Sequence, residues 1–546
     1  MAAPLVLART VAARAFRLNP LLFSVLILSV FLFWSYRGPV QQQWHSMKLP
    51  QTSPHLTSHP VDVLVDHYKK KFERMLESQS STLEEATAKY QERYHRPPPP
   101  GFDHWFEFAK KQNSTIIDDF DTIEESVQYL QSARPEQLRN AVRSAASAAN
   151  AKACSWTTRD GRPNLMQCDW MGREVEKVLA LVQDPLPDTE LLLNSLDEPR
   201  VISPVGTSND DQIPAWIDAS RKSIWDRVTQ ICQDRKAEPS KNAGLNQKTG
   251  IGSLKFVTDV EDAKDLCKHP EYANMHGFFQ APTTFLFTDS VVPVLSNARP
   301  STFRDILYPP PYYIGVKDMK PYNEAEDPDW ELKRPQLYWA GSTTGSYASA
   351  SSDTWRSSHR QRFVARVNQL SNESATFLTE TSRGVWEPFT SQDVSPQLYD
   401  VKFTNVVQCE ESQCIQINDY FHPSEKEERS TSFHYRFLFD LDGNSFSGRY
   451  YTLLESKSVV LKQTIFKEWH DDRLVPWVHY IPVSMDMGEL PELMRYLALT
   501  ERGSRISKDI ANAGRDWLRK VLRKEDAAVY MYRLLLELGR LMNPPP

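Results

Sequence analysis

The segment from Asp440 to Arg449, DLDGNSFSGR, combines residue types that suit a bound diphosphate. An apolar run precedes it, and its glycines, Gly443 among them, and serines let a ligand approach the backbone. Backbone amides and a helix dipole would hold phosphate there, Arg449 would pair with phosphate oxygens, and Ser447 would donate a hydroxyl. The same residues also fit a hairpin turn that carries an exposed arginine.

Asp440 and Asp442 form an Asp-x-Asp pair, a spacing that can hold a divalent cation. Asp440 also lies at the end of an apolar run, so a structural carboxylate is the alternative interpretation. The histidines have no ligand spacing to one another or to cysteine, which argues against zinc. We therefore predict no metal site and no cofactor, and keep a divalent cation at the aspartate pair as the minor alternative.

Asp197 follows the apolar run Glu190–Leu196, which the pattern predicts to be a strand. In open α/β sheets ligands bind at the carboxyl ends of the strands, where Asp197 would lie. A carboxylate in a cleft could accept a proton from a hydroxyl group, which makes Asp197 a candidate general base. The alternative is an ordinary turn, because Asp-x-Pro is common in loops.

A second glycine-containing loop, Gly341–Gly345, follows the apolar run Gln336–Ala340. Small residues allow close approach to a ligand, so Ser342 is a candidate contact. Arginines after this loop could reach the phosphates of the ligand, and Arg360 is the one we select. The alternative is that residues 356–366 form the solvated face of a helix.

These candidate residues require strands and helices in alternation to position them. Helical patterns at Ile123–Leu130, Pro135–Ala149 and Val175–Val182 alternate with short apolar runs, and further runs occur at Arg436–Leu441, Ser458–Leu461 and Trp477–Val483. We predict an α/β chain with two Rossmann-like lobes, residues 101–325 and 326–546, the second including C-terminal helices.

The residues Leu18–Tyr36 carry no charge and are mostly apolar. At about 1.5 Å per residue they would nearly cross a hydrocarbon core of about 30 Å, so we predict a transmembrane signal anchor over 18–36. A cleaved signal peptide is the alternative. Arginines before the span favour a cytosolic tail, 1–17, and a single-pass type II protein of the Golgi membrane, with the endoplasmic reticulum as second choice.

A stem over residues 37–100 would follow the anchor, with a flexible tether and one amphipathic helix from Val61 to Tyr94. Sequons at Asn113 and Asn372 fit the lumenal side. In an oxidising lumen the six cysteines could form local disulfides, and Cys154–Cys168, Cys232–Cys267 and Cys409–Cys414 are the candidate pairs.

The chain has 546 residues, with 64 lysines and arginines against 70 aspartates and glutamates. This slightly acidic balance, without a basic block, excludes nucleic acid as an expected partner. Gly-x-Ser-x-Gly and Gly-x-x-x-x-Gly-Lys motifs are absent, which argues against serine hydrolases and phosphate-loop NTPases.

The ordered blocks of this chain resemble glycosyltransferase family 90, which includes animal protein O-glucosyltransferases and fungal xylosyltransferases. The blocks are GFDHWFEFA from Gly101, LPDTELLLNSLDEP from Leu186, VPVLSNARPSTFRDILYP from Val292, LYWAGSTTG from Leu337, WRSSHRQRF from Trp355, HYRFLFDLDGNSFSGRYYTLLESKSVVLKQ from His434 and EWHDDRLVPWVHYIPV from Glu468. The resemblance implies an inverting transferase of the GT-B type with an acceptor-side lobe and a nucleotide-sugar-binding lobe. Asp197 would be the base, and Ser342, Arg360, Ser447 and Arg449 would hold a UDP-sugar donor.

The chain departs from the O-glucosyltransferases in the segment Arg200–Ser290, which resembles the fungal and capsule-type branch. The resemblance therefore implies xylose as the first donor sugar, glucose as the second, and a glycan of a capsule or cell-wall type as acceptor. A protein O-glucosyltransferase is one alternative. A catalytically silent lumenal protein that binds glycans in the same cleft is the other.

Overall fold

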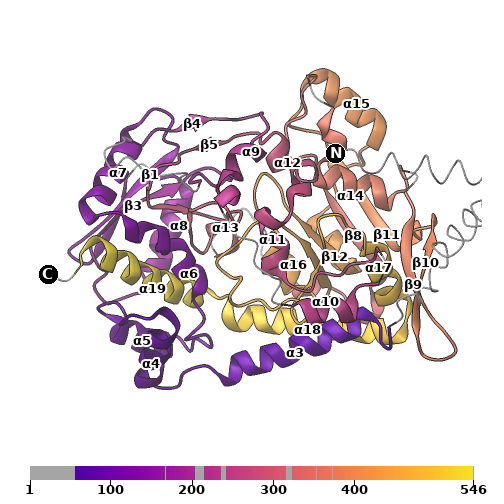
Figure 1. Cartoon of the computed structure of the whole chain (residues 1–546), viewed down its shortest axis with the longest axis horizontal. Helices are drawn as coiled ribbons and strands as arrows, with labels where there is room; N and C mark the ends of the chain where they lie inside the picture. The colour runs from indigo at the N-terminus through magenta and orange to yellow at the C-terminus, as the bar shows by residue number, and fades with distance from the viewer. Residues whose placement is uncertain are drawn as a thin grey trace, which may run out of the picture. The chain divides into compact units, whose positions relative to one another are not determined.

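A parallel sheet of five strands organises the second half of the chain, in the order β11-β8-β12-β13-β14 (Figure 1). The computed structural model describes residues 56–544 except 167, 203–213, 235–241, 252, 315–321, 352 and 372. The strands of this sheet are β8 (Arg334–Ser342), β11 (Tyr399–Asn405), β12 (Tyr435–Leu441), β13 (Val459–Gln463) and β14 (Ile481–Pro482). Strands β12 and β13 are buried along almost their whole length, as parallel strands covered by helices require, whereas burial alternates along the edge strand β11.

The sheet of the first half is mixed, with the order β2-β1-β3-β6-β7. It contains β1 (Ala153–Arg159), β2 (Arg162–Met166), β3 (Thr189–Asn194), β6 (Val294–Ser296) and β7 (Ile306–Leu307). Strand β1 runs antiparallel to β2 and to β3, whereas β3, β6 and β7 are parallel. The carboxyl ends of β3 and β6 therefore lie at one edge, from which the loop with Asp197 starts.

Smaller elements complete the described chain. Two antiparallel pairs stand outside the large sheets, namely β9 (Ala375–Glu380) with β10 (Trp386–Ser391), and β4 (Ile217–Asp218) with β5 (Leu286–Phe287). The helices that cover the first sheet and continue into residues 200–314 are α5 (Phe102–Lys111), α6 (Asp121–Val127), α7 (Pro135–Ser147), α8 (Trp170–Leu179), α9 (Trp225–Val228), α10 (Ala243–Thr249), α11 (Val260–Lys264), α12 (Gly277–Gln280) and α13 (Pro311–Ile314). The later helices are α14 (His359–Val367), α15 (Glu411–Phe421), α16 (Tyr450–Glu455), α17 (Leu490–Leu499), α18 (Glu501–Val521) and α19 (Lys524–Met542).

Helix α19 returns from the second half of the chain to the first sheet (Figure 1). Its apolar residues join those of β3, α5 and α8 in one hydrophobic core. The indole of Trp105 in α5 donates to the carbonyl of Val529 over 3.0 Å. A Cβ on Gly539 would lie 2.4 Å from Cβ of Pro187, so glycine allows this close approach. The first sheet is thus covered by residues that are far away in sequence.

The predicted single helix from Val61 to Tyr94 is two helices, α3 (Pro60–Glu77) and α4 (Leu83–Tyr94). Thr82 and Glu85 form a capping box that starts α4, which explains the break. Helix α3 packs on the core of the second sheet, where Asp62 accepts from the hydroxyl of Tyr496 over 2.8 Å. The segment from Pro60 therefore packs on the folded body.

The prediction of two Rossmann-like lobes with an N-terminal transmembrane helix was wrong. The described chain is a mixed α/β fold with several sheets, and the first large sheet is not the doubly wound parallel sheet that was expected. The hairpin β1–β2 explains the difference, because Asp160 and Gly161 at its turn have φ values of 49° and 76° and reverse the chain. Sequence periodicity did not identify this hairpin.

The predicted N-terminal transmembrane helix is likewise not supported. Among the helices within residues 56–544 that the structure describes, none combines the length and apolar composition needed to cross a membrane. The residues 18–36, for which the anchor was predicted, lie outside the described residues, as do the predicted tail and the first part of the stem.

Candidate active site

Asp197 lies just past the end of β3, on a turn that Asn194 organises. Oδ1 of Asn194 accepts from the N–H of Leu196 over 3.0 Å, and its Nδ2 donates to the carbonyl of Glu198 over 2.8 Å. These bonds fold the loop against the strand end and leave the side chain of Asp197 exposed. The hydroxyl of Tyr312 lies 3.4 Å from Oδ1 of Asp197 and donates to it. Asp197 is therefore accessible to a hydroxyl of another molecule.

A second carboxyl group, that of Glu198, is buried directly beside Asp197. Burial raises the pKa of Glu198 to about 8, and the negative charge of Asp197 acts in the same direction. Glu198 is therefore mostly protonated at neutral pH. The loop after β3 thus presents one exposed carboxylate and keeps one uncharged carboxyl group in the interior.

Arg360 of α14 joins the two candidate loops of the second sheet. Its Nη1 donates to the carbonyl of Ser342 over 2.9 Å and to Oγ1 of Thr344 over 2.6 Å, and its Nε donates to the carbonyl of Asp442 over 2.7 Å. Burial and the nearby charge of Arg449 lower the pKa of Arg360 to about 9. Arg360 therefore shapes the loops that follow β8 and β12.

Arg449 lies at the start of α16, in the loop that was expected to bind a diphosphate. Its Nη1 donates to the carbonyl of Ala340 over 2.8 Å, and its guanidinium carbon lies 5.9 Å from the ring centroid of Trp339. The guanidinium of Arg360 lies 5.5 Å from the same ring. Two cationic groups thus lie against Trp339 at the ends of β8 and β12, an arrangement that suits an anion.

Two consecutive tyrosines of α13 link the loop of Asp197 to the loop of Arg449. Tyr312 contacts Asp197, and the hydroxyl of Tyr313 lies 3.2 Å from the carbonyl of Ser447 and 2.6 Å from Oε2 of Glu468. The ring of Phe446 lies 5.8 Å from that of Tyr312 and 5.4 Å from that of Tyr313. The candidate base and the candidate diphosphate segment therefore flank one short helix.

The carboxylates of Asp440 and Asp442 face the interior. Asp440 pairs with Lys462 on the neighbouring strand over 2.8 Å, in register with it. Oδ2 of Asp442 accepts from the N–H of Ile465 over 3.0 Å and lies 3.2 Å from Nε2 of His276. Within the described residues no group of three or more His, Cys, Asp or Glu side chains could hold a metal ion. The aspartate pair thus has structural partners of its own.

Three disulfides join the cysteines in the pairs Cys154–Cys168, Cys232–Cys267 and Cys409–Cys414. The second disulfide fastens the insertion between β3 and β5. Of the two sequons, Asn113 is exposed and follows α5, whereas Asn372 lies outside the described residues. Glycosylation of either asparagine remains a prediction.

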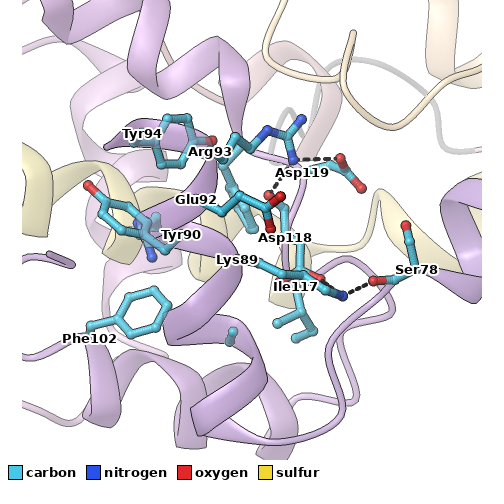
Figure 2. A pocket seen from close by; sticks show the side chains of 13 residues that line it. Ser78, Lys89, Tyr90, Glu92, Arg93, Tyr94, Phe102, Ile117, Asp118 and Asp119 are labelled. Carbon is cyan, nitrogen blue, oxygen red and sulfur yellow. Dashed lines mark hydrogen bonds and ion pairs between the residues drawn. The ribbon is translucent and has the colours of Figure 1, made fainter. Parts of the chain in front are cut away.

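A cavity of about 420 Å³ lies beside α4 (Figure 2). Arg93 extends across it and pairs with Asp119 over 2.9 Å. A larger cavity of about 1050 Å³ is lined by charged residues, including Glu125, Arg299 and Lys467. Asp197, Ser342 and Arg449 line neither cavity.

Sequence reasoning missed the aromatic residues that connect the candidate loops. Tyr312 and Tyr313 follow the block that ends at Pro309 after two further prolines, and Phe446 stands inside the diphosphate block. Two adjacent tyrosines after a run of prolines are the available signal. A sequence pattern could not reveal their partners, because Tyr313 and Ser447 are distant in the chain.

The comparisons with known proteins agree on one family. Residues 285–546 match the profile of Glycosyl transferase family 90. Protein O-glucosyltransferase 1 of Homo sapiens is 22% identical over 275 residues, which are 50% of this chain and 62% of that protein. The O-glucosyltransferase rumi homolog of Anopheles gambiae is 24% identical over 269 residues, which are 46% of this chain and 57% of that protein.

The chain thus spans less than two thirds of the length of these relatives. The family match includes Ser342, Arg360, Gly443 and Arg449, and it begins after Asp197 and after most of the insertion. The family resemblance of the sequence is confirmed: residues 285–546 of this chain match glycosyltransferase family 90.

Proposed function

We propose that the chain transfers a sugar from a UDP-sugar to an acceptor hydroxyl group with inversion at the anomeric carbon. The link through α13 carries this proposal, because Tyr312 contacts Asp197 and Tyr313 contacts the carbonyl of Ser447. A proton acceptor and a positively charged site that could bind an anion therefore lie on either side of the same helix. An inverting transfer needs this pair of features.

Asp197 accepts the proton of the acceptor hydroxyl while the oxygen of that hydroxyl bonds to the anomeric carbon and the bond from this carbon to UDP breaks. Tyr312 orients the carboxylate through its hydroxyl. Glu198 beside it is buried and mostly uncharged, so it adds little negative charge that would oppose the departing diphosphate.

Arg449 stabilises the negative charge that develops on UDP, with Ser447, Ser342 and loop amides as further donors. Arg360 supports the site by holding the loops after β8 and β12 through the carbonyls of Ser342 and Asp442. The charge of Arg449 lowers the pKa of Arg360, which means that the two cations repel each other. A bound diphosphate would relieve this repulsion, which favours anion binding.

Glucose and xylose are the two donor sugars that we propose. The names of the relatives, protein O-glucosyltransferase 1 and O-glucosyltransferase rumi homolog, favour glucose. Xylose rests on the resemblance of the insertion to the fungal and capsule-type branch. We propose a glycan hydroxyl as acceptor, and a protein hydroxyl, suggested by the same names, is the second candidate. The three disulfides support a location in the oxidising lumen of the secretory pathway.

A panel of UDP-sugars tests this function, with release of UDP as the measurement. We expect the full chain to release UDP from UDP-glucose or UDP-xylose. Asp197→Asn should lower the rate by about 100-fold or more and leave the affinity for UDP unchanged. Asp188→Asn, at a partly exposed carboxylate before β3, is the matched control and should keep the activity.

Two outcomes would contradict the proposal. Full activity of Asp197→Asn would remove the base from the mechanism. Binding of UDP without any release of UDP from the sugar panel, also in the presence of glycan and peptide acceptors, would favour the alternative of a silent binding protein.

A further inference from the structure

The insertion between β3 and β5 reaches the loops that carry the candidate diphosphate site. The N–H of Gly277 lies 3.3 Å from Nδ1 of His359, and the N–H of Tyr347 donates to the carbonyl of Ala281 over 2.7 Å. Residues 276–281 thus contact the loop after β8 and the start of α14. The family match begins at residue 285, so these contacts come from outside it.

His276 of the insertion and His359 of α14 form a buried stacked pair. Their ring centroids are 3.9 Å apart and the rings are nearly parallel, at 3°. Nδ1 of His276 accepts from the N–H of Phe278 and Nδ1 of His359 accepts from the N–H of Gly277, so the proton of each ring is on Nε2. Burial lowers the pKa of both histidines well below the ordinary value, which keeps both rings neutral.

Both rings hold Asp442, the residue before Gly443 of the candidate loop. Nε2 of His276 lies 3.2 Å from the carboxylate of Asp442, and Nε2 of His359 donates to its carbonyl over 2.8 Å. The same carbonyl accepts from Arg360. The position of this turn therefore depends on a residue of the insertion.

Three glycines meet where the insertion touches the two loops. A Cβ on Gly277 would lie 2.5 Å from the carbonyl oxygen of Gly345 and 2.6 Å from Cβ of Ser346. A Cβ on Gly345, whose φ is 105°, would lie 2.7 Å from the carbonyl oxygen of Gly443. The atoms in the way are backbone atoms of Gly345 and Gly443 and the Cβ of Ser346, none of which is the end of a flexible side chain, so a side chain at Gly277 would displace the loop.

We infer that His276 and Gly277 are positioning residues for the donor, through which the insertion fixes the loops of Gly345 and Gly443 in the shape that receives the diphosphate. This inference rests on the proposed function. It gives a role in donor binding to a segment that precedes the family match. Backbone donors must converge on the phosphates, so a small loop displacement weakens several hydrogen bonds at once.

The affinity for UDP tests the inference in the full chain, by titration calorimetry. Gly277→Ala should raise the Kd for UDP by about tenfold or more, the factor that corresponds to about one displaced hydrogen bond. Gly244→Ala is the matched control, because it lies in α10 of the same insertion and a Cβ there would meet no atom within 4 Å. Its Kd for UDP should equal that of the unaltered chain.

A second variant covers the case that Gly277→Ala does not fold. His276→Phe keeps a flat ring against His359 but removes the donor that faces Asp442, and it should also raise the Kd for UDP. His276→Gln retains a donor and should restore part of the affinity. The unfolding temperature of each variant is measured in parallel.

An unchanged Kd for UDP in Gly277→Ala or His276→Phe, with a lowered unfolding temperature, would overturn the inference, because the contacts would then serve stability only. In that case the unaltered chain still binds UDP, so the proposed function stands. If the unaltered chain itself fails to bind UDP, the proposed function falls and this inference falls with it.

Discussion

Arg449 illustrates what a single residue contributes to the candidate site. One of its N–H groups donates to the carbonyl of Ala340, which fixes the guanidinium beside Trp339. Burial lowers its pKa, yet an arginine remains charged at any physiological pH. A fixed, partly desolvated cation binds a diphosphate more strongly than a freely solvated one.

Arg449→Ala should therefore raise the Kd for UDP by about 10- to 100-fold, as expected for the loss of a hydrogen bond to a charged group. Titration calorimetry measures the change. Arg356→Ala is the control, because the side chain of Arg356 is 47% exposed and its guanidinium stacks on Trp355. Equal effects of the two substitutions would mean that Arg449 acts only through the overall positive charge and does not contact the diphosphate.

Removal of divalent cations should leave the turnover unchanged. Arg449 supplies the positive charge for the diphosphate, while Asp440 is already paired with Lys462. The rate of UDP release with and without EDTA is the measurement. Loss of turnover in EDTA, with recovery on addition of Mg²⁺ or Mn²⁺, would revive the interpretation of Asp440 and Asp442 as metal ligands.

At the scale of elements, the strands beside the site were predictable and the helices that cross between the sheets were not. The runs Glu190–Leu196, Gln336–Ala340, Arg436–Leu441 and Ser458–Leu461 correspond to β3, β8, β12 and β13, because buried strands are continuously apolar. Asp197 follows β3, Ser342 ends β8, and Ser447 and Arg449 follow β12. The partners of α3 and α12 were not predictable, because their contacts join residues far apart in sequence.

Helix α3 offers a test at this scale. Leu64 is fully buried in the core of the second sheet, together with Tyr496. Leu64→Ala should lower the free energy of unfolding by about 2–5 kcal/mol, because it leaves a cavity. Leu499→Ala, at a side chain that is 59% exposed, is the control and should change it by less than about 0.5 kcal/mol.

Denaturant unfolding gives both values. An equally small effect of the two substitutions would mean that α3 contributes little to the core of the second sheet.

At the scale of the whole molecule, buried carboxyl groups make stability depend on pH. Burial raises the pKa of Glu198 to about 8 and those of Asp442 and Glu468 to about 7. Such a group stabilises the fold below its unfolded pKa, about 4, and this contribution is lost as the pH rises through the folded pKa. We therefore expect the unfolding temperature to fall as the pH rises from about 5 to about 8.

Glu198→Gln removes one of these titrations. Below pH 8, the free energy of unfolding of this variant should fall less steeply with rising pH than that of the unaltered chain. The two slopes should differ by on the order of 1 kcal/mol per pH unit. Denaturant unfolding at a series of pH values measures both slopes. Glu501→Gln, at a side chain that is 95% exposed, should leave the slope unchanged. Identical slopes in all three proteins would refute the assignment to Glu198.

The packing of α3 and α19 on segments far away in sequence has a consequence for synthesis on the ribosome. Helix α3 emerges early but packs against Tyr496, and β3 is covered by α19, whose last residue is Met542. Helix α3 and the first sheet therefore wait for partner segments that are translated hundreds of codons later. We expect nascent chains that stop before α17 to expose both apolar surfaces and to depend on chaperones until the last helix is released.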